Sequence, residues 1–200
     1  DTYDFVPLSG GRVALMIGDV TGHGVGAALL THAVQAALRS YLELLSDPNE
    51  IVTRLNQRLV AGVETGNFMS LVLVIVDPHA RTLQYVNAGH PGLIHVHAGG
   101  ITVLEKTGMV LGVVGDQTYA VSPIVPLAPG DLLFLHTDGV DEAMSPSRAV
   151  FGSERLHQML GQLRSESADQ VLQSVEAQLR DHVGSGTFED DFTMIAVKLL

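Results

Sequence analysis

Carboxylates recur where apolar stretches of this sequence end, which is where a strand can present a side chain to a ligand. Asp19 follows one apolar run and stands in a turn rich in glycine, and Asp138 follows another and precedes a glycine. Carboxylates that converge raise one another's pKa unless cations neutralise them, and hard divalent cations prefer oxygen ligands. The pattern therefore indicates Mg²⁺ or Mn²⁺ chemistry. Hairpin topology can bring further carboxylates to the same edge: Asp190 and Asp191, just before the predicted closing strand, and Asp1 and Asp4, on the predicted first strand.

The spacing of apolar residues changes along the chain between that of helices and that of strands, and it predicts the elements that must position these carboxylates. Apolar residues at helical spacing predict helices over 25–45, from a start at 47–50, over 153–164 and over 168–183. Ser167 with Gln170, and Asp47 with Glu50, predict capping boxes at two of these starts. Strands are expected over 1–7, 12–18, 69–76, 81–88, 93–96, 101–104, 119–127, 131–136 and 192–199. Several of them form hairpins, with turns at 9–11, 98–100 and 128–130.

This order of elements predicts an α+β fold. Strict β-α-β alternation is missing, which argues against a doubly wound parallel sheet. Two mainly antiparallel sheets packed together, with a helix pair covering each outer face, give a four-layer αββα sandwich. We expect residues 1–200 to form a single domain, and because the sequence begins inside a predicted strand, we expect it to be a module of a longer protein.

The composition narrows the function classes. The formal net charge is −11 and only 11 residues are Lys or Arg, so nucleic acid is an unsuitable partner. No apolar run reaches the roughly 18 residues that span a bilayer, and no signal peptide is present. Cysteine is absent, which excludes disulfides, zinc–thiolate sites and a phosphocysteine intermediate. These features favour a cytoplasmic domain.

Five short motifs occur in order and are spread over almost the whole chain. They are Asp1-Thr2-Tyr3-Asp4-Phe5, Gly18-Asp19-Val20-Thr21-Gly22-His23-Gly24, Asn87-Ala88-Gly89-His90-Pro91, Thr137-Asp138-Gly139-Val140-Asp141-Glu142-Ala143 and Asp190-Asp191-Phe192-Thr193. Together they resemble the bacterial branch of the PP2C-like metal-dependent protein phosphatases, of the stage-II-sporulation-E and sigma-B-regulator type. The resemblance implies the αββα fold and a site for two Mn²⁺ or Mg²⁺ ions.

The resemblance also assigns roles. Asp1 and Asp19 match ligands of the first and bridging positions, Val20 matches a backbone-carbonyl ligand, and Asp138 and Asp190 match ligands of the second ion. Asp19 and Asp138 would thereby act in catalysis, by a metal-activated water that attacks phosphorus without a phosphoenzyme.

Other motif residues keep a structural interpretation beside the functional one. Taken singly, even Asp19 and Asp138 are explained by capping or turn positions. His90 is interpreted as a structural histidine, and Thr21 stands where the eukaryotic branch has a histidine. The secondary candidates, each with an exposed, turn-forming or structural alternative, are Asp4, His23, Gly139, Glu142 and Asp191.

The function implied is a Mg²⁺/Mn²⁺-dependent phosphatase for phosphoserine or phosphothreonine in a protein. By resemblance, the substrate is a phosphorylated anti-sigma-factor antagonist of the STAS type, and upstream sensor domains set the activity. The oligomeric state stays open, with a homodimer among the assemblies considered. The alternatives are a non-catalytic regulatory or binding module on the same fold, and a nucleotide-binding loop at Gly22-x-Gly24-x-Gly26, which lacks the Lys-Ser/Thr of a phosphate loop.

Overall fold

Residues 1–62, 67–91 and 93–200 are described by a computed structural model, in which each of two units holds one antiparallel sheet and its own helices. Both units are discontinuous in sequence. Unit 1 consists of Asp1–His90 and Glu105–Leu127, and unit 2 consists of Pro91–Leu104 and Ala128–Leu200.

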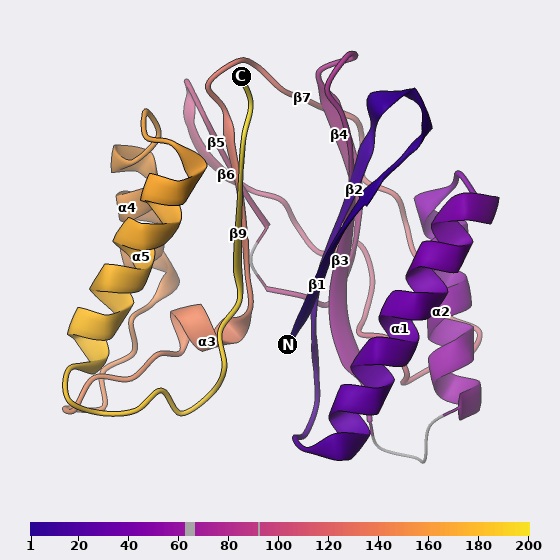
Figure 1. The fold of residues 1–200 in the computed structure, drawn as a ribbon, viewed down its shortest axis with the longest axis horizontal. Helices are drawn as coiled ribbons and strands as arrows, with labels where there is room; N and C mark the ends of the chain where they lie inside the picture. Colours follow the sequence, from indigo (N-terminus) through magenta and orange to yellow (C-terminus); the bar gives the residue numbers. More distant parts are fainter. Residues whose placement is uncertain (63–66, 92) are drawn as a thin grey trace. The chain divides into compact units, whose positions relative to one another are not determined.

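Unit 1 contains the sheet of order β1-β2-β3-β4-β7, in which all pairs are antiparallel. Helices α1 and α2 lie against this sheet (Figure 1). A short 3-10 turn at Ser9–Gly11 joins β1 to β2, as the glycines there predicted. The elements are β1 (Thr2–Pro7), β2 (Val13–Val20), α1 (Val25–Leu44), α2 (Pro48–Gly62), β3 (Met69–Asp77), β4 (Thr82–Ala88) and β7 (Val125–Pro126).

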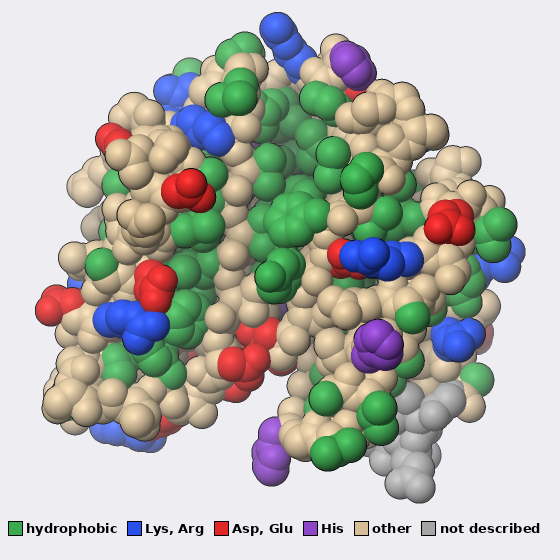
Figure 2. Space-filling model, in the orientation of Figure 1, with side chains coloured by type: hydrophobic (Ala, Val, Ile, Leu, Met, Phe, Trp, Pro, Cys, Tyr) green, Lys and Arg blue, Asp and Glu red, His purple; other side chains and the backbone are tan. Residues whose placement is uncertain are grey.

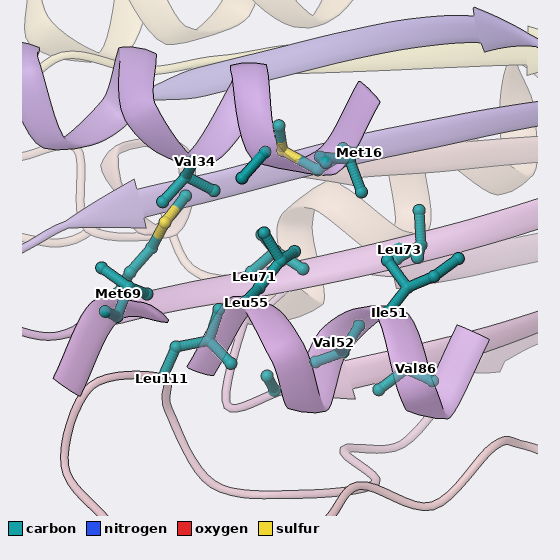
Figure 3. Close-up of a cluster of buried hydrophobic side chains, with 14 of the residues drawn as sticks. Met16, Val34, Ile51, Val52, Leu55, Met69, Leu71, Leu73, Val86 and Leu111 are labelled. Atoms are coloured by element: carbon teal, nitrogen blue, oxygen red, sulfur yellow. The ribbon is translucent and has the colours of Figure 1, made fainter. Parts of the chain in front are cut away.

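Alternate residues of β2 and β3 build the core of unit 1. Met16 and Leu71 are almost fully buried against Leu55 of α2 and its neighbours (Figure 3). Burying a side chain of this size stabilises a fold by roughly 1.5–3 kcal/mol. Because successive side chains of a strand alternate between faces, Asp19 and Ser70 lie on the face of the sheet away from the helices.

Local capping chemistry fixes where α2 begins. The Asp47 side chain accepts a hydrogen bond from the Asn49 backbone N–H (2.9 Å), and Pro48 is the first helical residue, as predicted. Glu50 was expected to complete a capping box. Its carboxylate instead bonds Arg54 one turn later, at 2.7 and 3.1 Å.

Unit 2 contains the antiparallel sheet of order β6-β5-β8-β9, and α4 and α5 pack against it. Phe134 and Ile94 of the sheet are buried against Leu156 and Val175 of the helices. The capping box of Ser167 and Gln170 at the start of α5 is confirmed. The elements are β5 (Leu93–His97), β6 (Gly100–Val103), β8 (Leu132–His136), α3 (Asp138–Asp141), α4 (Ser153–Gln162), α5 (Ala168–Val183) and β9 (Met194–Lys198).

One predicted hairpin is wrong. Segments 119–127 and 131–136 were expected to pair around the turn at 128–130. Only Val125–Pro126 is a strand, and it pairs with β4 in unit 1, whereas β8 pairs with β5 and β9 in unit 2. Proline has no N–H for a ladder, so Pro123 and Pro126 limit the first segment to a short edge strand.

The predicted α+β class is confirmed, with two antiparallel sheets that each have a helix pair. The stacking of the two sheets in a sandwich, and the single domain over 1–200, stay predictions. Within each unit, the Lys and Arg side chains on the face shown in Figure 2 are interspersed with other side chains. None of the helices in the described part of the chain is long and apolar enough to cross a membrane.

Candidate functional site

Asp19 is the penultimate residue of β2, just before the strand leads into the glycine-rich turn. Its carboxylate Oδ1 lies 3.7 Å from the backbone nitrogen of Asp1, because β1 and β2 pair with Thr2 opposite Gly18. The structure therefore brings Asp1 and Asp19 together in unit 1. Val20 follows, with its side chain buried on the helix side of the sheet, so its main chain stands at the strand end beside Asp19.

Thr21 ties the glycine-rich turn to the strand next to it. Its N–H donates to the Phe68 carbonyl (3.0 Å), and its hydroxyl oxygen accepts from the Phe68 N–H (3.0 Å). The threonine that replaces the histidine of the eukaryotic branch thus has a structural task here. His23, two residues later, is exposed.

Asp4 lies on the other face of the sheet from Asp19. Its carboxylate is buried and accepts two hydrogen bonds from Arg39 of α1, each 2.7 Å long. The hydrogen bonds from Arg39 hold the pKa of Asp4 below its usual value, against the opposing effect of burial. This placement gives Asp4 a structural task, in the attachment of α1 to β1.

His90 is fully buried beside the same strand end. Its Nδ1 lies 2.7 Å from Ser70 Oγ, and its backbone N–H donates to Asn87 Oδ1 (2.8 Å). Ser70 is the residue opposite Asp19 in the β2–β3 pair. The position is consistent with the structural interpretation of His90.

In unit 2, two distant motifs are bonded to each other. The Thr137 hydroxyl accepts from the Thr193 N–H (2.9 Å), and the Thr137 N–H donates to the Thr193 carbonyl (3.1 Å). A side chain on Gly139 would meet the Asp191 carbonyl oxygen at 2.3 Å, so only glycine allows this close approach. The structure therefore brings the Asp138 motif and the Asp190-Asp191 motif together.

The carboxylates of unit 2 affect one another. Desolvation by neighbouring groups, a side-chain hydrogen bond with Asp191 and the negative charges of Asp191 and Asp138 raise the pKa of Asp190. The Asp191 N–H also donates to Asp190 Oδ1 (2.9 Å). A raised carboxyl pKa with acidic neighbours is the mark of negative charge that a cation would relieve. Glu142, four residues after Asp138, is exposed.

Sequence reasoning missed His136 and Asp141. His136 is buried, its Nδ1 donates to the Thr137 carbonyl (3.0 Å), and its Nε2 lies 3.9 Å from Asp141 Oδ2. Burial lowers the pKa of His136, and the charges of Asp141 and Asp138 oppose that effect in part. The sequence signal was present, since His136 is the polar end of an otherwise apolar strand directly before the Thr137-Asp138-Gly139 motif.

The donor set suits hard cations. Its members are carboxylate oxygens and a backbone carbonyl, which is the chemistry that Mg²⁺ and Mn²⁺ prefer. Among the described residues, however, no three His, Asp or Glu side chains form a group that could hold a metal ion. The two-ion site formed by Asp1, Asp19, Val20, Asp138 and Asp190 therefore stays a prediction.

Comparison with known proteins places the chain among a defined group. The sequence profile of the stage II sporulation protein E (SpoIIE) family matches residues 9–200. The chain is 27% identical to the IcfG protein of Synechocystis sp. over 98% of its length and 35% of that protein. It is 26% identical to the phosphoserine phosphatase RsbU of Bacillus subtilis over 99% of its length and 58% of that protein. It therefore spans less than two thirds of these curated relatives.

Solved structures agree with this grouping. The SiaA-PP2C domain of Pseudomonas aeruginosa matches with a TM-score of 0.86 and 27% identity, over 98% of this chain and 79% of that one. The RsbU and RsbW domains of Rv1364c from Mycobacterium tuberculosis match with a TM-score of 0.81 and 25% identity, over 98% of this chain and 54% of that one. The predicted resemblance to PP2C-like proteins of this branch is confirmed.

Proposed function

Because the chain belongs to the SpoIIE family of PP2C-like proteins, we propose that it is a Mg²⁺- or Mn²⁺-dependent protein phosphatase that hydrolyses phosphoserine or phosphothreonine. The observation that carries this proposal is that an aspartate occupies each of the four positions that the resemblance assigns to the ions. Asp1 and Asp19 lie at the ends of paired strands, Asp138 begins α3, and Asp190 lies in the segment before β9. Asp19 lies beside Asp1 in unit 1, and the Asp138 motif is bonded to the Asp190 motif in unit 2. A non-catalytic module would have no need to keep all four.

The residues that would hold the ions are Asp1, Asp19, the Val20 carbonyl, Asp138 and Asp190. The chemistry that bound Mg²⁺ or Mn²⁺ supplies is stabilisation of the charge that develops on the phosphoryl group, together with a lower pKa for the attacking water. The chain's own task is to hold these oxygens in place. Thr21 anchors the turn after Asp19, and Thr137 anchors the turn that carries Asp138.

We also propose the substrate class. A relative that covers the full chain is named a phosphoserine phosphatase, and a matching structure joins an RsbU domain to an RsbW domain. These names support a phosphorylated anti-sigma-factor antagonist of the STAS type as the substrate, in a partner-switching pathway. The chain spans 35% and 58% of two curated relatives. From the family resemblance we also propose that upstream sensor domains set its activity.

The test is phosphate release from a STAS-type protein phosphorylated on serine, measured with and without Mn²⁺. We expect release to depend on Mn²⁺ and to fall by roughly 100-fold or more in Asp19→Asn and in Asp138→Asn, because even outer-shell changes cost 10–100-fold at metal sites. Asp181→Asn, on the exposed side of α5, makes the same chemical change away from the motifs and serves as the matched control.

Two outcomes would contradict the proposal. If Asp19→Asn and Asp138→Asn retained activity, the assignment of these two carboxylates to catalysis would be wrong. Calorimetry that shows no binding of Mn²⁺ or Mg²⁺ to the folded chain would favour the non-catalytic module instead.

A further inference from the structure

His90 is a polar side chain that is fully buried in the structure. It is 0% exposed, and its ring nitrogen Nδ1 is 2.7 Å from the Ser70 hydroxyl. A buried imidazole must be hydrogen-bonded to avoid a cost of about 1–3 kcal/mol. The bond to Ser70 is therefore a strong constraint on both side chains.

The loop that carries His90 is fixed by its own backbone. Gly89 has a φ of +71°, and a side chain there would meet Val110 at 2.5 Å, so no other residue fits without a shift. Asn87 accepts from the His90 N–H through its side chain, and its carbonyl accepts from Thr107 N–H (2.9 Å). These contacts fix the backbone of the loop, and the bond to Ser70 positions the imidazole ring.

Ser70 stands between His90 and Asp19. It is opposite Asp19 in the antiparallel β2–β3 pair, so the two side chains share the face of the sheet away from α1 and α2. Side chains paired in this way have Cβ atoms about 4.5–5.5 Å apart, within reach of each other's polar atoms. The hydroxyl that His90 holds is thus a cross-strand neighbour of the carboxylate.

The number of protons available decides which group donates in each of the two hydrogen bonds. An ionised carboxylate can only accept, so Ser70 can serve Asp19 only as a donor. The Ser70 oxygen must then accept from a proton on His90 Nδ1. The opposite arrangement, with Ser70 donating to a bare Nδ1, would leave the hydroxyl no proton for Asp19.

We propose that His90 and Ser70 are positioning residues for Asp19: His90 Nδ1–H donates to Ser70 Oγ, and the Ser70 hydroxyl donates to the Asp19 carboxylate and orients it toward the cation. The inference rests on the proposed metal-dependent function, and it adds the two side chains behind the ligand. Such partners orient the first ligands of metal sites and tune their affinity.

The first experiment measures Mn²⁺ binding by calorimetry on the full chain, with no substrate. We expect Ser70→Ala to raise the Mn²⁺ dissociation constant roughly 10–100-fold. His90→Leu, which keeps the bulk and loses the donor, should weaken binding in the same way. His90→Asn should restore much of the affinity, because its amide nitrogen stands as many bonds from Cα as Nδ1 does.

A double variant separates positioning from general damage. If Ser70 acts through Asp19, Ser70→Ala should change nothing further in the Asp19→Asn background. Ser122→Ala is the matched control, since Ser122 is also a buried serine of unit 1 that bonds the Tyr85 N–H (3.0 Å) and the Pro123 carbonyl (2.9 Å). It should lower the melting temperature and leave the Mn²⁺ dissociation constant unchanged.

A measurement on the unmodified chain covers the case in which a variant fails to fold. Nitrogen-15 NMR of the His90 ring should show Nδ1 protonated. An Nε2-protonated ring with a bare Nδ1 would overturn the proposal, and so would a Ser70→Ala variant with the parent's Mn²⁺ affinity while Asp19→Asn binds weakly. If Asp19→Asn itself binds Mn²⁺ like the parent, the proposed function fails instead.

Discussion

Arg39 of α1 holds Asp4 of β1 through both carboxylate oxygens, with Nε to Oδ2 and Nη2 to Oδ1 each at 2.7 Å. The Asp4 side chain is 8% exposed and the Arg39 side chain 61% exposed. Arg39 thus covers a buried carboxylate from the solvent side. This pair, together with the bond from Gln35 Nε2 to the Tyr3 carbonyl (2.9 Å), fastens the helix to the edge strand of unit 1.

Loss of Arg39 should destabilise unit 1 in a pH-dependent way. Because hydrogen bonds from Arg39 lower the pKa of Asp4, the stability they contribute is full above the unfolded pKa of about 3.9 and is lost as the pH falls through the lower folded value. Urea unfolding of Arg39→Ala should show a lower midpoint than the parent at pH 7, and the difference should shrink toward pH 3.

Arg54→Ala is the control for that series, since Arg54 makes an exposed pair with Glu50 at i,i+4. Such pairs contribute only about 0.3–0.5 kcal/mol. An Arg39→Ala midpoint that tracks Arg54→Ala at both pH values would show that the Asp4 contact does not support the fold.

Asp131→Asn should destabilise unit 2 by about 1.5–3 kcal/mol, the range for hydrogen bonds to charged groups. Asp131 Oδ2 accepts from the Ala128 N–H and from His95 Nε2, both at 2.9 Å, and the side chain is 3% exposed. Burial alone would raise the pKa of Asp131, but the Ala128 and His95 bonds and the Arg164 charge outweigh it and lower that pKa. Equilibrium urea unfolding at pH 7 measures the effect.

His97→Ala, on the strand that carries His95, provides the comparison. His97 is half-buried, bonds Thr102 Oγ1 (3.0 Å) and packs on the His95 ring at 5.0 Å, but it pairs with no buried carboxylate. We therefore expect a smaller loss of stability than for Asp131→Asn. Equal losses from Asp131→Asn and His97→Ala would contradict a special contribution from the buried pair.

Gly139→Ala should cost about 1–3 kcal/mol, the usual penalty of overpacking, because the new Cβ would lie 2.3 Å from the Asp191 carbonyl oxygen. A backbone oxygen cannot swing aside as a side chain can, so the Asp190-Asp191 segment must move away from Asp138. Thermal unfolding measures the loss. Gly26→Ala, in α1 with nothing within 4 Å of the new Cβ, should instead gain up to about 1 kcal/mol. If Gly139→Ala left the melting temperature unchanged, the Asp138 and Asp190-Asp191 motifs would not be packed as closely as the structure indicates.

Mn²⁺ should raise the melting temperature of the chain, because an ion that binds only the folded state stabilises it by mass action. At a concentration of 100 times the dissociation constant, the gain is about 2.7 kcal/mol. The shift should disappear on addition of a chelator and should be smaller in Asp138→Asn. An identical shift in Asp138→Asn, measured by calorimetric scanning, would place the ion elsewhere on the protein.

Local signals in the sequence predicted local features well. Ser167 and Gln170 are three residues apart, so the chemistry of their capping box is visible in the sequence and the structure contains it. Features that join distant segments were harder to predict. Arg39 and Asp4 are 35 residues apart, and no periodicity links a helix arginine to a particular strand carboxylate. The partner of 125–126 was missed for the same reason, because a turn at 128–130 looks alike whether the chain folds back or crosses to another sheet.

The candidate site divides in the same way. The carboxylates that follow apolar runs made Asp19 and Asp138 candidates from the sequence alone, and their role as metal ligands stays a prediction. The Ser70–His90 bond and the proximity of His136 to Asp141 depend on how strands pair and how a short helix begins at Asp138. Those relationships come from tertiary structure, and a single sequence carries no direct record of them.

The discontinuity of both units has a consequence for how the chain folds during synthesis. In unit 1, β4 gains its last partner only when Pro126 pairs with Thr82. In unit 2, β5 pairs with β8 only after residues 132–136 have been made, and β8 in turn pairs with β9. Until then, strand edges and apolar faces of both units are exposed to aggregation, and pairings so far apart in sequence form slowly. A chain cut between 104 and 105 would leave each unit divided between the two fragments, so we expect neither fragment to fold alone.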